Sequence, residues 1–527
     1  MSWSGAFLDI IESTAPIAPK WHLEFFEDFH GTIGTDYQIS NWNPNFATVI
    51  GAVVSTGAGR ITPGSWNFTQ GGFTVEVVGD ISEILNLVQR GNLARLLMGF
   101  GDWDLSDYQP VAIGALQSIS GIYPNYVFQF KDLITHLQTR HTATTNELAL
   151  FAAIDGATTG VRVSTTIRAL TSYTVGDTVL NLTDKTGFDH GDKGAVIIDN
   201  GVDDPFFLTF TGTATSPDRL TGVGTSNVHD TVRVASPTGS TVTLAAWVGE
   251  HPCDFSRQIL SSTGAGSNGA YDNLPKTWGL AVWDEWIDHD DINQIKSVIG
   301  NKAGTDHNWS VIVEESQDNA IGWLAAVLAP AGIWLCMRQG QITMRAAQNP
   351  NELSANRYNL PIISEIEITD RDIEEIEGWQ GWHPDTPAEG FQSVVYYKYG
   401  HTTAGDSSVN LSDSTLVSLP AIEEMPHDLS DVIWQASNQP ATDILYRCHM
   451  WELRIPEWIR LRCRGLRLAQ LAVGDLVTLT TDRAQGRMDH TIAGYAECVA
   501  MVSAIEIFWA DGIVTIELTI PSLEFGT

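Results

Sequence analysis

Cationic side chains are scarce in this chain of 527 residues. Lys and Arg together number 29 against 63 Asp and Glu, which gives a formal net charge of −34 at pH 7. Proteins that wrap nucleic acid neutralise its phosphates with cationic side chains, so this balance excludes such a function. An acidic wall repels DNA and therefore suits a conduit along which DNA slides without sticking. The alternative is that the acidic surface only keeps a large protein soluble.

Cysteine is also scarce, and no two cysteines form a CxxC pair. The chain has five, an odd number, which argues against a disulfide framework. Zinc or an iron-sulfur cluster would need ligands gathered from distant parts of the chain. We interpret the cysteines as small buried hydrophobic residues: Cys253, Cys336, Cys448, Cys463 and Cys498.

A secretory signal and a membrane span are both missing from the pattern. The first residues, MSWSGAFLDIIES, have neither a basic start nor a long apolar core. The uncharged segment Ala320 to Met337 has about the minimum length of a spanning helix, but Pro330 and Gly332 interrupt it. Its pattern predicts a helix over Asp318 to Leu328 and a strand over Gly332 to Arg338. We therefore expect no stable membrane span.

Familiar catalytic signatures are absent, since the chain has no HExxH, no GxSxG and no Walker lysine loop. Gly264, Gly266 and Gly269 do match the GxGxxG dinucleotide fingerprint. That fingerprint needs a strand before it and a helix after it, whereas a helix precedes it here and Tyr271 to Pro275 follows. We interpret these glycines as a flexible loop. The sequence predicts no catalytic or cofactor-binding residue and no enzymatic activity.

Acidic residues nevertheless offer one alternative function. Glu24, Glu27 and Asp28 lie close together in EFFEDF, and glycoside hydrolysis uses paired carboxylates. The chain also has 18 Trp, whose rings stack on sugars. Because no second sign of a substrate cleft accompanies the cluster, we interpret it as a solvated strand edge. A carbohydrate-binding or glycoside-hydrolysing protein remains the alternative.

Three further groups carry side chains that bind metals in other proteins. His22 with His30 lacks zinc spacing, and so does Asp189-His190 with Asp192, so we interpret them as loop residues. An acidic run has the composition of a calcium site without the spacing and glycine of an EF-hand, and we expect most of it to cap a helix: Asp284, Glu285, Asp288, His289, Asp290 and Asp291. No metal site is predicted.

What the chain does contain is strand patterning towards both ends. Gly474-Asp475, inside Leu471 to Leu479, predicts a turn that starts a strand. Residues 73–77 alternate between apolar and polar, which predicts a strand with one buried and one wetted face. The same alternation recurs near the C-terminus: Val514, Thr515, Ile516, Glu517, Leu518, Thr519 and Ile520. The predicted fold class is mainly β, with a β-barrel towards each end.

Between these barrels the pattern changes twice. Short strands broken by Gly, Asp and Pro predict a small inserted β-module. A later period near 3.6 predicts an α+β subdomain, with helices packed on a small sheet and a hairpin at Gln339-Gly340. We expect a further helix, with flanking loops, over Ser430 to Arg447. The predicted domains are a first barrel at 1–165, the module at 166–240, the α+β subdomain at 241–350 and a second barrel at 351–527.

Ile259 to Leu280, which includes STGAGSNGAYDNLP, resembles a segment common in tail hub proteins of tailed bacteriophages. The helix, strand and hairpin predicted from Asp318 to Met344 are similar to the same family. So is GDLVTLT followed by a last strand rich in Val and Ile. The module at Thr174 to Gly224 resembles small β-modules inserted in phage structural proteins. The resemblance covers about half of the chain.

The resemblance implies a baseplate hub or tail-tip hub that assembles as a homotrimer. In such hubs each subunit supplies two tube-like barrels, so three copies form a pseudo-sixfold ring that meets the hexameric tail tube. The implied partners are a distal tail protein, the tail tube, the tape measure and tip or fibre proteins, while DNA passes through the channel without specific binding. The implied location is the distal end of the virion tail, after synthesis in the host cytoplasm. Some tail-tip relatives hold an iron-sulfur cluster, but the scattered cysteines here predict no cofactor.

Overall fold

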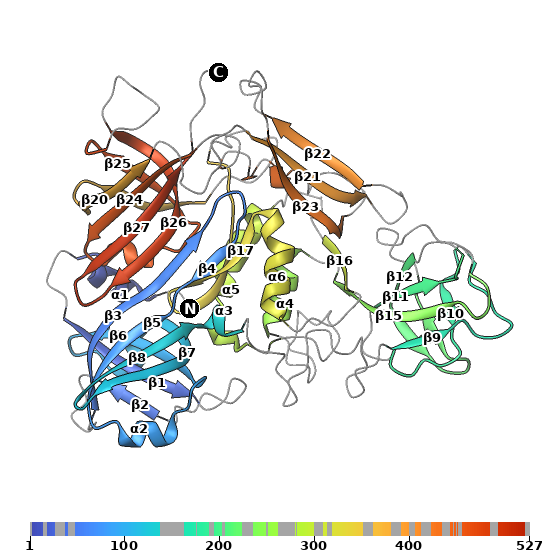
Figure 1. The fold of residues 1–527 in the computed structure, drawn as a ribbon, viewed down its shortest axis with the longest axis horizontal. Coiled ribbons are helices and arrows are strands. Elements are labelled where there is room, and N and C mark those ends of the chain that lie inside the picture. Colours follow the sequence, from blue (N-terminus) through green and yellow to red (C-terminus); the bar gives the residue numbers. More distant parts are fainter. Residues whose placement is uncertain are drawn as a thin grey trace.

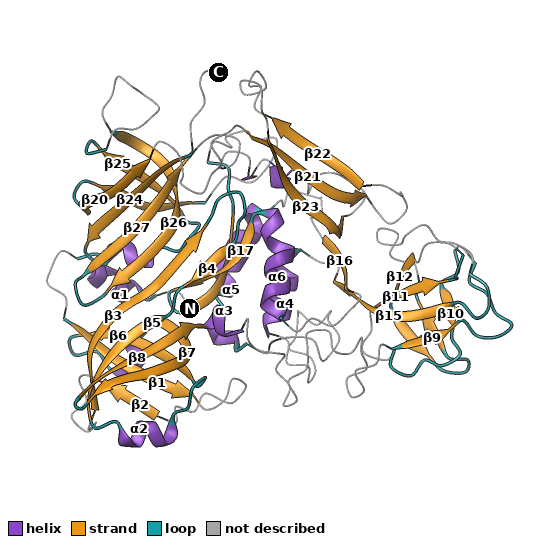
Figure 2. Ribbon diagram, viewed as in Figure 1, coloured by secondary structure: helices purple, strands orange, loops and turns teal. Residues whose placement is uncertain are grey.

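Strands dominate the structure, a computed structural model, and its helices are short (Figure 2). The helices are α1 Gly5–Ile11, α2 Ser82–Leu87, α3 Leu133–Leu137, α4 Pro252–Ser261, α5 His289–Val298 and α6 Ala320–Leu328. Shorter 3-10 helices are η1 Leu105–Asp107, η4 Asp284–Trp286, η5 Ala329–Ala331 and η6 Arg467–Gln470. The structure describes residues 3–13, 18–26, 37–40, 48–137, 163–174, 176–188, 194–202, 206–223, 236–248, 251–261, 280, 282–299, 309–313, 319–350, 362–380, 391–399, 406–412, 423–434, 443–445, 447–448, 451, 456–484 and 494–521.

The first eight strands form a curled antiparallel sheet, which we call the N-terminal body (Figure 1). Its hydrogen-bonded order is β2-β1-β6-β7-β8-β5-β3, and β4 pairs with β3. β2 also contacts β3, so the two ends of this order approach one another. The strands are β1 Pro19–Phe26, β2 Tyr37–Ser40, β3 Thr48–Ile61, β4 Phe68–Gln70, β5 Phe73–Gly79, β6 Leu93–Phe100, β7 Gln109–Ile122 and β8 Asn125–Asp132.

Six strands late in the chain form a second curled sheet, which we call the C-terminal body. Its order is β19-β25-β26-β27-β24-β20, with β19 parallel to β25 and the other pairs antiparallel. The outer strands β19 and β20 follow one another through a tight turn, in which Asp372 N–H donates to Thr369 O at 2.9 Å. The strands are β19 Ile363–Thr369, β20 Ile373–Gln380, β24 Glu457–Arg464, β25 Leu476–Thr481, β26 Tyr495–Phe508 and β27 Ile513–Ile520.

The long strand β3 belongs to both bodies. Its first part pairs with β5, whereas Thr56, Gly59 and Arg60 pair with β26. Gly57 has a φ of +73°, a left-handed conformation that glycine adopts without strain, and the register with β26 shifts beside it. The two bodies are therefore one continuous 14-stranded sheet. Among the described strands no ladder closes either body into a complete barrel, although the mainly β class with two strand-built bodies is as predicted.

Alternation predicts burial correctly in one body and wrongly in the other. In β5 Phe73, Val75 and Val77 are buried and Glu76 is exposed, as predicted. In β27 the predicted wetted face is wrong, because Glu517 is only 6% exposed and Thr519 is fully buried. Long side chains of neighbouring strands cover that face: Trp458 Nε1 and Arg460 Nη1 each reach the Glu517 carboxylate at 3.3 Å.

A compact module stands apart on the far side of the molecule, at the right of Figure 1. It has a hydrophobic cluster of its own, built from residues between Ile167 and Leu244. A three-stranded sheet, β10-β14-β13, packs with the longer ladder β12-β11-β15, to which β9 is added. The strands are β9 Ser164–Thr166, β10 Val179–Asn181, β11 Gly194–Asp199, β12 Phe206–Phe210, β13 Gly212–Ala214, β14 Arg219–Thr221 and β15 Thr241–Val248.

The module's sheet continues into strands from three other parts of the chain. The order runs β12-β11-β15-β16-β23-β21-β22, with β16 Trp309–Val313, β21 Phe391–Tyr399, β22 Asp406–Ser412 and β23 Glu423–Trp434. Of the three strands from the range 351–527 in this sheet, β23 pairs with β16, β21 pairs with β23, and β22 pairs with β21. Within the range Ser430 to Arg447, residues 430–434 belong to β23, where a loop or helix was expected, and residues 443–445 and 447 are helical; the other residues of that range lie outside the described part of the chain. Strand pairing with β16 overrides the local helix pattern.

A hairpin and the helices α4 and α6 lie beside the two bodies, on the side towards the module (Figure 1). The hairpin pairs β17 Ile333–Arg338 with β18 Gln341–Ala346, and both turn residues have positive φ, 50° at Gln339 and 72° at Gly340. This is the two-residue turn that the sequence predicts there. α6 and β17 lie where a helix and a strand were expected, with the Asn319 side chain accepting from Gly322 N–H at the helix start. No helix in the described ranges is long and apolar enough to cross a membrane.

Candidate functional site

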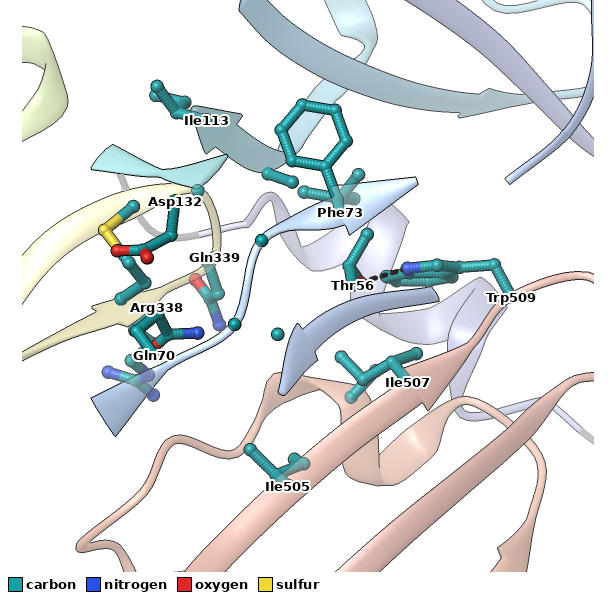
Figure 3. Close-up of a pocket in the computed structure, with 18 of the residues that line it drawn as sticks. Thr56, Gln70, Phe73, Ile113, Asp132, Arg338, Gln339, Ile505, Ile507 and Trp509 are labelled. Atoms are coloured by element: carbon teal, nitrogen blue, oxygen red, sulfur yellow. Dashed lines mark hydrogen bonds between the residues drawn. The ribbon is translucent and has the colours of Figure 1, made fainter. Parts of the chain in front are cut away.

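The two bodies and the β17–β18 hairpin meet around a pocket (Figure 3). Counting the space at its mouth, it encloses about 560 Å³. β3, β5 and β26 contribute to it together with the hairpin turn and Trp3 near the N-terminus. Trp3 is fixed there because its indole donates to Pro110 O at 2.8 Å and its backbone N–H donates to Gln339 Oε1 at 3.0 Å.

The pocket has walls of opposite character. In Figure 3 polar side chains lie on one side of the pocket, and apolar side chains lie above and opposite. The polar residues are Gln70, Asp132, Arg338 and Gln339, and the apolar ones include Phe73, Ile113, Ile505, Ile507 and Trp509. The Trp509 indole N–H donates to the Thr56 hydroxyl, which joins the end of β26 to β3. A ligand of mixed polarity is therefore the kind that this pocket suits.

Asp132 is a buried charge-bearing group of the pocket wall. Its Oδ1 accepts from Thr135 N–H at 3.0 Å and caps α3, and the residue is only 4% exposed. Within the described part of the chain, no hydrogen-bond partner reaches its Oδ2. Burial raises the pKa of Asp132 to about 6. A buried carboxylate with one unused oxygen is costly unless something donates to it.

Arg338, at the end of β17, lies on the same wall. Its Nη1 donates to Asp291 Oδ1 at 2.9 Å, which anchors the guanidinium. Its Nε is also buried, and among the described residues nothing accepts from it. Asp132 Oδ2 and Arg338 Nε are thus both buried and, among the described residues, without a hydrogen-bond partner.

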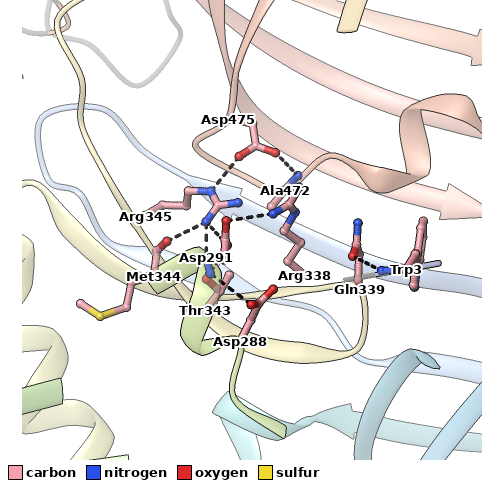
Figure 4. A network of polar contacts seen from close by, with 10 residues as sticks. All are labelled: Trp3, Asp288, Asp291, Arg338, Gln339, Thr343, Met344, Arg345, Ala472 and Asp475. Atoms are coloured by element: carbon pink, nitrogen blue, oxygen red, sulfur yellow. Dashed lines mark hydrogen bonds and ion pairs between the residues drawn. The ribbon is translucent and has the colours of Figure 1, made fainter. Parts of the chain in front are cut away.

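A buried ionic network lies behind this wall and ties three elements together (Figure 4). Asp291 of α5 accepts from Arg345 Nη1 and from the Thr343 hydroxyl on β18, the latter at 2.6 Å. Arg345 Nε donates to Asp475 Oδ1, before β25, at 2.7 Å. Burial raises the pKa of Asp291, but Arg345 and Arg338 outweigh it and hold the pKa below its usual value. Burial likewise lowers the pKa of Arg345, and Asp475 with Asp291 more than reverses this.

The Gly474-Asp475 turn adapts the C-terminal body to this network. Gly474 has a φ of +99°, and a Cβ there would lie 2.4 Å from the Trp334 ring. Asp475 Oδ2 accepts from Ala472 N–H at 2.8 Å, which closes the turn and leaves Oδ1 for Arg345. The turn that the sequence predicts is therefore also a contact between the C-terminal body and the hairpin.

Glu24, the first of the acidic candidates, is not on a solvated edge. It lies on β1 between β2 and β6, is 5% exposed and forms an ion pair with Arg95 at 2.7 Å. The expectation of a solvated position is wrong because β2 covers the outer side of β1. Its partner Arg95 occupies the carboxylate, which disfavours a role as a catalytic acid. Glu27 and Asp28 lie outside the described residues.

The acidic run before α5 divides into two roles. Asp288 caps the helix as predicted, accepting from Asp291 N–H at 3.1 Å. Asp291 instead belongs to the ionic network, and Asp284 pairs with His289 at 3.1 Å. Within the described residues no three His, Cys, Asp or Glu side chains gather as a metal site requires.

Of the remaining candidate residues from the sequence, only some lie within the described part of the chain. His22 lies on β1, is 1% exposed and stands 3.8 Å from Glu24, so its placement in a loop is wrong. Burial lowers its pKa. Several candidates lie outside the described residues: His30, Asp189, His190, Asp192, Gly264, Gly266 and Gly269.

All five cysteines are free thiols. Four are buried, as interpreted from the sequence, and Cys498 is half-buried. Burial raises the pKa of Cys253, Cys336 and Cys463 to about 12 and that of Cys498 to about 11, so these thiols stay protonated near neutral pH.

Sequence patterns did not identify the pocket residues Asp132 and Arg338. Asp132 follows a strand and precedes Leu133-Ile134, which is the pattern of a helix cap and carries no sign of a ligand. Arg338 and Arg345 read as alternating polar residues of a hairpin. Of the ionic network, the sequence indicated only the turn at Gly474-Asp475, and it did not indicate that Asp475 pairs with Arg345.

Comparisons with known proteins give weak likenesses only. No family model matches the chain, and no curated protein matches it. Among solved structures, the prophage tail protein gp18 from Listeria monocytogenes EGD-e matches with 8% identity and a TM-score of 0.37 over 96% of this chain and 95% of that one. A native gene transfer agent virion matches with 15% identity and a TM-score of 0.17 over 46% and 83%. The p2 virion baseplate in its activated conformation matches with 7% identity and a TM-score of 0.22 over 96% and 100%.

Proposed function

We propose that this chain is a structural protein of the tail of a tailed bacteriophage and acts there as a hub. Three copies form a pseudo-sixfold ring at the distal end of the tail, joining the hexameric tube to the tip. The observation that carries the proposal is the presence of two curled strand bodies in one chain, fused through β3 into a single sheet. Three copies of a doubled body present six similar units, which is how a trimer matches a hexamer.

The fusion through β3 supports this role physically. A ring subunit must hold its two bodies at a fixed angle, since an error in that angle accumulates around the ring. The Arg345 network and the indole of Trp509 brace the same junction with buried polar contacts. A junction braced in this way resists bending better than a loop linker does.

The net charge of −34 supports the second half of the proposal, a central channel through which DNA leaves without binding. The resemblance of Ile259 to Leu280 and of the last strands to tail hubs points in the same direction. The proposed partners are the tail tube, a distal tail protein, the tape measure and tip or fibre proteins, and the protein performs no catalysis.

Electron microscopy of the purified chain tests the proposal. We expect threefold rings with a central opening, and mass photometry in the same buffer is expected to give three times 57.6 kDa. A monomer at micromolar concentration that binds or cleaves glycans would instead support the carbohydrate alternative. Mixing the purified chain with a purified hexameric tail tube then tests whether the ring docks onto the tube.

A further inference from the structure

Four neighbouring strands of the N-terminal body, β7, β8, β5 and β3, turn one face away from its core (Figure 1). Residues paired across antiparallel strands point to the same face, so the register arranges the outward side chains in rows. The middle row consists of Ser120, Val127, Glu76 and Ala52. None of these four is buried, whereas the adjacent residues Val75 and Phe128 belong to the core.

The rows on either side of this one carry no charge, and none of their residues is buried. One row consists of uncharged polar side chains: Ser118, Gln129, Thr74 and Ser55. The other row reaches the turn between β7 and β8: Ile122, Asn125, Val78 and Val49. Ile122 is 84% exposed, and Tyr123 in the turn itself is 69% exposed. We call these three rows the outer face, and Glu76 is its one charged residue.

The polar rows of the C-terminal body carry charges instead. Arg460 lies 2.8 Å from Glu377 and 3.3 Å from Glu517, and Arg462 lies 3.4 Å from Glu374. The outer face is therefore unusual in a chain with a net charge of −34. Two copies of such a chain repel one another through their acidic surfaces and approach most easily where acidic side chains are scarce. The outer face meets this condition.

The size of the outer face indicates what kind of contact it can make. Neighbouring strands lie about 4.8 Å apart and successive rows about 7 Å apart, so the face measures roughly 20 Å by 20 Å, or about 400 Å². A stable pair of proteins buries about 800 Å² on each partner. In a closed ring two neighbours hold each copy and the last contact forms within the assembly, so a smaller contact is sufficient.

We propose that the outer face is a contact surface between copies of this chain. The inference rests on the proposed function, because in a ring of three this face packs against a different surface of the neighbouring copy. Ile122 and Tyr123 supply the apolar part of the contact. The Ser, Thr, Asn and Gln side chains of the rows supply hydrogen-bond donors and acceptors without charge repulsion.

Two double variants, each adding two negative charges, test the contact. Ser120→Asp with Ile122→Asp places the charges on the outer face, and Leu170→Asp with Val202→Asp places them on the module, at residues that are 101% and 87% exposed. All four positions are exposed, so we expect both variants to keep the thermal unfolding midpoint of the parent. In sedimentation velocity over a concentration series, we expect the module variant to remain trimeric like the parent. The outer-face variant should associate on the order of a hundredfold more weakly.

Gln129→Glu tests the same face with almost no change in shape. The carboxylate keeps an oxygen that accepts from the Ser118 hydroxyl, which lies 2.9 Å from Gln129 Oε1. We expect this single charge to weaken association about tenfold, again with an unchanged unfolding midpoint.

The outcomes separate this inference from the proposed function. Trimers that persist in both outer-face variants would overturn the inference and leave the ring standing. Trimers of those variants that no longer dock onto a purified hexameric tail tube would assign the face to the tube, which also overturns the inference. A parent that forms pairs, lost in the outer-face variants, would support the contact and contradict the ring. A monomeric parent would overturn both.

Discussion

The N-terminal and C-terminal bodies both contain strands in which apolar and polar residues alternate, but they differ in how far the polar residues are buried. β5 has one buried face and one face that reaches solvent, whereas seven of the eight residues of β27 are buried. Both strands alternate apolar and polar residues in the sequence. The difference lies with the neighbours, since β24 and β3 extend Trp458, Arg460 and Arg60 across the polar row of β27. Alternation therefore predicts which face is apolar, and side-chain length on adjacent strands decides whether the other face is wet.

Placing a charge in either apolar row is expected to have the largest effect. Ile516→Asp in β27 and Val75→Asp in β5 each bury a carboxylate at a position with no measurable exposure, and each should destabilise the fold by about 4 kcal/mol or more. Leu476→Asp in β25 should behave alike. Chemical denaturation measures the loss. An unchanged midpoint in any of the three would show that its apolar row is not in the core.

Arg345→Met comes next, because it leaves Asp291 and Asp475 buried without their shared partner. We expect a loss of about 3–5 kcal/mol in the free energy of unfolding. Arg464→Met is the matched control, since Arg464 is an exposed residue of the C-terminal body whose ion pair with Glu374 is solvated, and its stability should not change. Equal effects in the two variants would mean that the junction network contributes nothing special.

Asp132→Asn is expected to change how the stability of the fold depends on pH. The pKa of Asp132 in the folded protein is about 6, above its ordinary 3.8, so between these values the folded state holds a proton that the unfolded state has released. Stability is therefore lost as pH rises from about 4 to about 6, and the loss is complete above pH 6. The variant should be more stable than the parent at pH 7.5, by on the order of 1–3 kcal/mol, and equal to it at pH 4. Parallel stability profiles across this range would contradict the buried carboxylate.

The smallest effects come from the polar rows themselves. Glu517→Gln removes the charge that Trp458 and Arg460 share, and we expect a loss of about 1–2 kcal/mol. Glu76→Gln, at the corresponding kind of position in β5, is exposed and should change stability by less than about 0.5 kcal/mol. Urea denaturation of both variants side by side tests whether the two polar rows differ as described.

Much of the fold follows from local pattern. The hairpin at Gln339-Gly340, the cap at Asp288 and the strands around Leu476 and Ile516 occur where the sequence predicts them. Each depends on turn chemistry or periodicity within a few residues. The partners of β21 to β23 could not be predicted, because any of several exposed edges satisfies an alternating strand equally well until distant strands are placed.

The pocket was beyond prediction for a related reason. Asp132 and Arg338 are about two hundred residues apart in the chain, and neither lies in a spacing that signals a ligand. Glu24 is a second example of a position that local sequence could not predict. Its acidic neighbours suggested that it is exposed, whereas it is buried and forms an ion pair with Arg95 on a different strand. Pairings of this kind are set by the order of strands, which single-sequence periodicity does not encode.

Strand β3 makes the molecule a continuous mechanical element. β3 forms main-chain hydrogen bonds with β5 on one side of Gly57 and with β26 on the other. A force applied along β3 loads the hydrogen bonds of each ladder together, in shear. The force is therefore transmitted from one body to the other. Loops bear little of that load. Under tension we therefore expect the two halves to yield as one unit, while the outlying module, which has its own separate cluster, detaches at a lower force.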